Sequence, residues 1–206
     1  MNLTLKPQTL YALAKYIAAK DDIRYYLNAV LIEAAPDAIY CVATDGRKLV
    51  AIREQYGQGD ERPQETQQFI VPREACGKPY KDFAAVYTFE GVKVAVRALT
   101  KAGTTDTTFA LVDAQYPNWR SIMPQSVSGE KAQFDPGLCA AVNECYSATV
   151  NAKKVVCIPI AHNGNSAGTM IRGDFVGVVM PMRGDKPEAV PAWALPAQPE
   201  KVKKAA

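Results

Sequence analysis

Few residues in this sequence could carry out catalysis. The chain has one histidine, His162, in the segment 162–165 (HNGN), which is typical of a hairpin turn, where we expect the ring to face solvent. The phosphate-binding pattern G-x-x-x-x-G-K-[ST] is absent from the sequence. We therefore do not expect an enzyme, and no residue pattern indicates a cofactor.

Cysteines are the other candidates for chemistry, as metal ligands or disulfides. Their number is odd, none are spaced as C-x-x-C, and most stand among apolar neighbours: Cys41, Cys76, Cys139, Cys145 and Cys157. Structural zinc sites use closely paired ligands, so we expect no metal. Buried thiols in a reducing compartment fit this pattern best. The N-terminus does not have the layout of a signal peptide and no apolar run could span a bilayer, so we expect a cytoplasmic protein with no membrane contact.

Positive charge is concentrated at one predicted turn. Apolar and β-branched residues run up to Thr44, the pair Asp45-Gly46 is typical of a tight hairpin turn, and an apolar strand resumes at 49–52. Arg47 and Lys48 follow the glycine directly, so the turn presents two cations beside Leu49. This arrangement fits either a solvated turn or a docking surface. The net charge of +3 is too small to indicate nucleic acid by itself.

The elements around this turn follow a repeated order. A strand at 3–5 precedes an amphipathic helix that starts at Pro7, with apolar residues Leu10, Leu13, Ala14 and Ile17 at helical spacing. Strands follow at 25–32 and on both sides of the Asp45-Gly46 turn. This first unit reads strand, helix, strand, strand, strand.

Two further units are predicted downstream. The second has a strand at 69–71, a short helix from Pro72 to Cys76, and strands at 85–89, 92–96 and 107–112. The third starts at 132–134, has a helix capped by Asp135, and continues with strands at 155–160, 168–171 and 175–180. Three units of one kind indicate an internal structural repeat.

Three stretches resemble motifs of one known family. They are residues 25–28 (YYLN) with 43–49 (ATDGRKL), 116–124 (YPNWRSIMP) and 178–183 (VVMPMR). Together with the order of the units, they resemble the β sliding clamp of bacterial DNA polymerase III. The resemblance implies an α+β protein with the DNA-clamp fold, built from strand-helix-strand-strand-strand units, about three per chain.

The resemblance also implies a domain organisation that is shorter than the family's. Residues 1–115 resemble the complete middle domain, residues 116–183 resemble the C-terminal half of the last domain, and residues 184–206 are expected to be a flexible Pro/Ala/Lys tail. Family rings contain twelve units, so four chains of three units would complete one. We therefore expect a homo-oligomer, a tetramer or a dimer, of which only the tetramer would have the twelve units needed to close a ring around duplex DNA.

A peptide-binding pocket follows from the same resemblance, because the family binds short linear peptides of polymerases and clamp loaders between its middle and last domains. Transferred position by position, its walls are Leu27, Thr44, Gly46, Arg47, Lys48, Leu49, Pro117, Ile122, Val178, Val179, Met180, Pro181, Met182 and Arg183. Arg47-Lys48 stand where the family usually has His-Arg, and Ser121 stands where arginine is common, so the peptide preference can differ. The competing interpretation is that these residues form an interdomain core.

Contact with duplex DNA would be independent of base sequence and carried by cations on or beside the helices. The candidates are Lys6, Lys15, Lys20, Arg24, Arg73, Lys78, Lys81, Lys153 and Lys154. The function implied is that of a replication processivity factor, and the alternative is a clamp-like adaptor or competitor that binds peptides without encircling DNA. Trp193 and Leu195 in the tail could fold back into the pocket.

Overall fold

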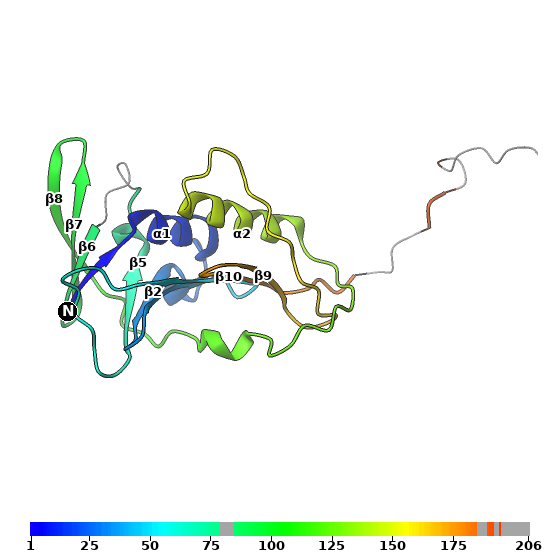
Figure 1. The fold of residues 1–206 in the computed structure, drawn as a ribbon, viewed down its shortest axis with the longest axis horizontal. Helices are drawn as coiled ribbons and strands as arrows, with labels where there is room; N and C mark the ends of the chain where they lie inside the picture. The colour runs from blue at the N-terminus through cyan, green and yellow to red at the C-terminus, as the bar shows by residue number, and fades with distance from the viewer. Residues whose placement is uncertain (79–84, 185–188, 192–193, 195–206) are drawn as a thin grey trace, which may run out of the picture.

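Two antiparallel sheets form the framework of the protein, and two helices lie side by side across one of them (Figure 1). The computed structural model describes residues 1–78, 85–184, 189–191 and 194. Lys81 and the tail residues Trp193 and Leu195 lie outside this described part.

The larger sheet joins strands from distant parts of the chain in the order β5-β2-β3-β4-β10-β9. Its first three consecutive strands are β2 (Ala29–Ala34), β3 (Ile39–Thr44) and β4 (Lys48–Glu54), flanked by β5 (Gln67–Pro72). β9 (Gly168–Arg172) and β10 (Phe175–Val179) complete the sheet, because β10 pairs with β4 from Phe175 opposite Ile52 to Val179 opposite Lys48. This pairing brings the end of β10 beside the turn at Asp45-Gly46.

The smaller sheet has the order β1-β6-β7-β8. It contains β1 (Asn2–Leu5), β6 (Ala85–Glu90), β7 (Lys93–Thr100) and β8 (Gly103–Ala110). β1 pairs with β6, and β5 pairs with β2, so the first two units each give one strand to the sheet of the other. The two sheets are thereby tied together.

Helix α1 (Pro7–Ala12) continues through a π-helical turn, Leu13–Ile17. Buried Glu54 accepts hydrogen bonds at its start, from the Lys6 N–H (3.2 Å) and the Thr9 hydroxyl (2.5 Å). At its end, the Arg73 guanidinium donates to the carbonyl of Ala18 at 2.9 Å and to that of Ala14. Side chains distant in sequence therefore satisfy the unpaired main-chain groups of both helix ends.

Helix α2 (Pro136–Thr149) lies beside α1. Its N-cap is Asp135, as predicted, and this carboxylate accepts a hydrogen bond from the Gly137 N–H at 2.7 Å. The helix packs closely on β10 at Gly177, where a Cβ atom would lie only 2.5 Å from Cγ1 of Val142. A side chain at position 177 would push the helix away from the sheet.

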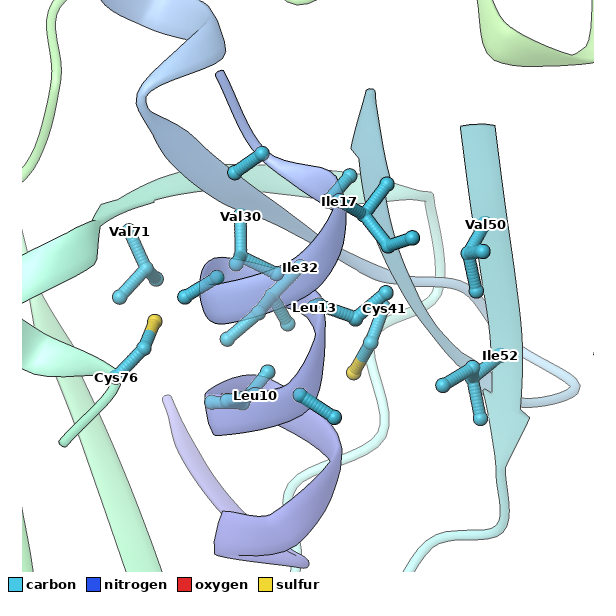
Figure 2. Packing of buried hydrophobic residues seen from close by; sticks show 14 of the residues in the cluster. Leu10, Leu13, Ile17, Val30, Ile32, Cys41, Val50, Ile52, Val71 and Cys76 are labelled. Atoms are coloured by element: carbon cyan, nitrogen blue, oxygen red, sulfur yellow. The ribbon is translucent and has the colours of Figure 1, made fainter. Parts of the chain in front are cut away.

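The main core lies between the helices and the sheets. Figure 2 shows Leu10, Leu13 and Ile17 of the first helical segment packed on the sheet. The facing side chains come from four neighbouring strands, β5, β2, β3 and β4, and from the segment after β5: Val30, Ile32, Cys41, Val50, Ile52, Val71 and Cys76. Because successive side chains of a strand point to opposite faces, the intervening residues must be buried elsewhere.

The opposite face of the six-stranded sheet is covered by the connector 111–124. A second core cluster lies between this face and the connector. It contains Leu31, Val42, Leu49 and Val178 from the sheet and buried Tyr116 from the connector. The strands are therefore apolar on both faces, which explains their nearly continuous apolar sequences.

The predicted α+β clamp-like fold is confirmed, with local corrections. The strand expected at 155–160 is wrong, because this segment runs along α2: the Val156 N–H donates to Ser147 Oγ and the Ile158 N–H to Asn143 Oδ1, each at 2.8 Å. The strand expected from Tyr25 begins only at β2, after a 3-10 turn over Tyr25–Leu27. The helix expected after Pro72 is a 3-10 turn, Arg73–Ala75.

Most of the cysteines pack inside the main core. Cys41, Cys76 and Cys145 are buried, and burial raises the pKa of the Cys76 thiol to about 12. Within the residues that the structure describes, no cluster of potential ligands could hold a metal ion. No helix in the same ranges combines the length and apolar character needed to cross a bilayer.

Candidate functional site

The turn between β3 and β4 forms one wall of an apolar cavity. Asp45 Oδ1 accepts hydrogen bonds from the N–H groups of Arg47 and Lys48, each at 2.8 Å, and Thr44 Oγ1 accepts one from Gly46 N–H at 3.0 Å. Gly46 has a φ of 89°, a conformation that favours glycine. A Cβ atom here would also lie 3.0 Å from Nη1 of Arg24. The sequence Thr-Asp-Gly therefore fixes the shape of this wall.

The connector forms the opposite wall through the 3-10 turn Trp119–Ile122. The Arg120 guanidinium lies 4.0 Å from the Trp119 ring centroid and 4.9 Å from that of Tyr40, and it pairs with Glu33 at 2.6 Å. Glu33 is buried on β2, and its second oxygen accepts a hydrogen bond from Gln68 Nε2 at 2.8 Å. These contacts attach the turn to the sheet.

The cavity between the two walls has a volume of about 250 Å³. Ten of the fourteen residues predicted for the peptide pocket line it: Leu27, Thr44, Gly46, Arg47, Lys48, Leu49, Pro117, Ile122, Val178 and Met180. They come from the Tyr25–Leu27 turn, the β3–β4 hairpin, the connector and β10. The three matching stretches of sequence thus meet at one place.

Four predicted wall residues lie elsewhere. Val179 is completely buried in the core on the helix side, because the alternation of side chains along β10 turns it away from Val178 and Met180. Pro181 is not part of the cavity lining. The Met182 N–H donates to the Gln133 carbonyl at 2.8 Å, and this pairing carries Met182 and Arg183 into a separate open hollow beside His162.

Four residues of the lining were not predicted for the pocket. They are Arg24, Tyr26, Asn118 and Trp119. Asn118 and Trp119 stand between the predicted residues Pro117 and Ile122, so their position in the 116–124 stretch was an available signal. Tyr26 lies directly before Leu27 in the 25–28 stretch, and Arg24 lies just before that stretch.

Charges at the rim are mostly paired within the protein. Arg24 Nε and Nη2 donate to the Asp22 carboxylate at 2.9 and 2.6 Å, and these hydrogen bonds lower the Asp22 pKa to about 2. Lys48 Nζ lies 2.5 Å from Asp45 Oδ2. Burial alone would raise the Asp45 pKa, but the hydrogen bonds from Lys48 and the turn N–H groups lower it. Both carboxylates therefore remain ionised partners at neutral pH.

The cations proposed to face DNA divide into two groups. Those with exposed side chains flank the two helices or follow Arg73–Ala75: Lys6, Lys15, Lys20, Lys78, Lys153 and Lys154. Arg73 is a correction, because its guanidinium is held by the helix-end carbonyls and by Asn28 Oδ1 at 2.5 Å. Arg24 is also a correction, because it pairs with Asp22 and lines the cavity.

His162 and Ser166 do not form a nucleophile and base. Residues 164–168 (GNSAG) fit the nucleophile pattern G-x-S-x-G. That pattern acts at a strand-to-helix turn, whereas here it leads into β9. His162 is not a solvent-facing turn residue, because Nδ1 accepts a hydrogen bond from the Ala132 N–H at 3.1 Å. This hydrogen bond occupies Nδ1 with the main chain, and among the described residues no hydrogen bond joins His162 to Ser166.

Beta sliding clamps are among the curated proteins that are similar to this chain. No family model matches the sequence. The beta sliding clamp of Pseudomonas aeruginosa is 29% identical over 128 residues, which cover 58% of this chain and 33% of that protein. The beta sliding clamp of Pseudomonas putida is 28% identical over 149 residues, covering 70% and 38%. The chain thus spans about a third of the length of these relatives.

Solved structures confirm the fold. A DNA polymerase III beta subunit from Eubacterium rectale superposes with a TM-score of 0.65 at 10% identity, over 89% of this chain and 66% of that one. A sliding clamp from Pseudomonas aeruginosa bound to griselimycin has a TM-score of 0.60 at 19% identity, over 89% and 65%. The resemblance to β sliding clamps inferred from three short stretches is confirmed in both sequence and fold.

Proposed function

We propose that this chain acts, like the β sliding clamps it resembles, as an accessory protein of DNA replication that binds linear peptides of polymerases and clamp-loader proteins. The observation that carries the proposal is the apolar cavity: ten of the fourteen residues that the resemblance assigns to a peptide pocket line it, from three separate stretches of chain. The relatives are named for a clamp and not for a reaction. We accordingly assign a non-enzymatic, cytoplasmic role.

The chemistry of the cavity supports a peptide as its ligand. Leu27, Leu49, Ile122 and Val178 provide apolar walls, and the flexible Met180 side chain can adapt to different ligands. Apolar pockets with a polar rim are the usual receptors for the anchor side chains of short peptides. A core sealed by packing would not leave an open volume at this position, so the cavity favours the pocket over the interdomain-core interpretation.

The substitution Ile122→Asp tests the pocket directly. Ile122 is 42% exposed, so the variant should fold, but a carboxylate would face the apolar cavity and disfavour an apolar anchor. We expect at least a tenfold loss of affinity, measured by isothermal titration calorimetry. The first probe is griselimycin, which occupies a structurally similar clamp, and the second is a peptide with two leucines and a phenylalanine.

The matched control for this experiment is Ile171→Asp. Ile171 is 59% exposed on β9 and does not line the cavity, so the same change of charge should leave the affinity unaltered. Equal binding by the Ile122→Asp variant and the wild type would refute the pocket assignment.

We further propose that the chain surrounds duplex DNA as an oligomer. In support, exposed lysines lie on or beside the two adjacent helices, and Lys6, Lys15 and Lys20 are among them. The edge strand β8 is exposed along residues 104–108 and could pair with a neighbouring copy. The domain division at 115/116 and the ring of four three-unit chains are part of this proposal. DNA would then be held by topology, so a small net charge is no objection.

Two measurements test the ring. Sedimentation at several concentrations should give the mass of four chains, and the protein should be retained on nicked circular DNA and released when the circle is linearised. A monomer that binds the peptide probe but is never retained would instead favour the alternative, a clamp-like adaptor or competitor that does not encircle DNA.

A further inference from the structure

Three cations line the cavity, but two of them are neutralised by partners in the chain. The Arg24 guanidinium makes two hydrogen bonds to the Asp22 carboxylate, and Lys48 Nζ pairs with Asp45 at 2.5 Å. The Lys48 ammonium and the Asp45 carboxylate are also largely buried, with 11% and 13% of their side chains exposed. Both cations are therefore already paired with a carboxylate of the chain.

Arg47 differs from both. Its side chain is exposed, and among the described residues it has no hydrogen bond, ion pair or ring contact. Its main chain is nonetheless fixed, because the Arg47 N–H donates to Asp45 Oδ1 at 2.8 Å and its carbonyl accepts from the Met180 N–H at 2.9 Å. An unpaired guanidinium therefore extends from a fixed point at the rim.

The surroundings of Arg47 restrict where an anion could lie. Arg24, Gly46 and Arg47 line both the apolar cavity and an adjacent polar hollow of about 390 Å³. That hollow also contains the carboxylates Asp21, Asp22 and Asp45. Asp22 and Asp45 have cationic partners, whereas exposed Asp21 would repel a second anion. A carboxylate is therefore favoured at the boundary between the two spaces, beside Arg47.

We propose, on the basis of the proposed function, that the peptide ligands of this pocket carry a glutamate or aspartate next to the apolar anchor, and that Arg47 pairs with it. Arg47 is then a specificity-determining residue of the pocket. A guanidinium can hold a carboxylate through two parallel hydrogen bonds, which adds direction to the attraction. The site is open to solvent, so the expected preference is moderate, about threefold to tenfold at low salt.

A peptide panel tests the proposal. Each peptide has the same anchor of two leucines and a phenylalanine, and glutamate, glutamine or lysine is placed in turn at each flanking position. Fluorescence anisotropy then gives the affinity for the full-length wild type and for Arg47→Gln. We expect the wild type to prefer glutamate over glutamine at one flanking position, and Arg47→Gln to bind both peptides equally. The preference should also shrink as sodium chloride is raised, because the pair is exposed.

Two further variants make the result specific. Arg47→Glu should reverse the preference toward lysine. Lys93→Gln changes the net charge by the same amount as Arg47→Gln, at an exposed position on β7 outside the cavity, and should keep the wild-type preference. A glutamate preference that survives in Arg47→Gln would overturn the proposal, and so would equal affinity of the wild type for glutamate and glutamine peptides.

Failure of this inference can be told apart from failure of the proposed function. If the glutamine peptide binds the wild type and Ile122→Asp abolishes that binding, the pocket stands even where no acidic preference is found. If no peptide of the panel binds, both the pocket and the role of Arg47 are overturned.

Discussion

Replacing Leu13 by alanine should lower the free energy of unfolding by about 2 to 5 kcal/mol, the range found when a buried leucine leaves a cavity. Leu13 lies in the π-helical turn that extends α1. Its side chain has no exposed surface and packs on the face of the sheet (Figure 2). Ile32 and Cys41 are fully buried on neighbouring strands, and a close-packed core relaxes only partly into a vacated space. Urea unfolding followed by circular dichroism measures the change.

A surface substitution provides the reference for this measurement. Val92 is 72% exposed between β6 and β7, and Val92→Ala should change the stability by less than about 0.5 kcal/mol. A loss below about 1 kcal/mol for Leu13→Ala would mean that the helical segment is not packed on the sheet as described.

Removing Arg120 should have the second large effect, and it should act on both stability and binding. The Glu33 carboxylate is 3% exposed and would lose its cationic partner, keeping only Gln68. Because Arg120 itself is 49% exposed, solvent screens the pair, and we expect Arg120→Ala to cost about 1 to 3 kcal/mol. The turn Trp119–Ile122 would also lose its attachment, so the affinity for the peptide probe should fall.

A double-mutant cycle separates the ion pair from the packing of Arg120. Glu33→Gln removes the buried charge, so adding Arg120→Ala to it should cost clearly less than in the wild type. The remainder would report the stacking of Arg120 on Trp119 and Tyr40. Additive losses would show that Glu33 and Arg120 do not stabilise one another.

Local sequence patterns were sufficient for most of the fold. Strand alternation, the Asp45-Gly46 turn and the Asp135 cap depend on interactions between residues close in the chain, and each is found where it was expected. The motif resemblance added the long-range fact that three stretches share one site. Ten wall residues of the cavity follow from that resemblance.

Other features depended on contacts that no local pattern contains. Residues 155–160 have the composition of a strand, but two side chains of α2 satisfy their N–H groups, so they join no sheet. Arg73 resembles any other surface cation in sequence, yet its guanidinium completes the end of a helix distant in the chain. Val179 follows the family motif but faces the core because β10 pairs with β4 in one fixed register.

The sequence by itself determined most of the elements and their order, because these depend on side-chain periodicity and on short turns, and the family resemblance indicated the segments that meet at the cavity. Only the tertiary structure decided which side chains are free at that cavity. Arg24, Arg47 and Lys48 are equivalent cations in the sequence, but Arg24 pairs with Asp22 and Lys48 with Asp45, whereas Arg47 has no such partner among the described residues. That difference arises from the relative positions of charged groups in the folded chain, and it makes Arg47 the residue on which ligand preference is proposed to depend.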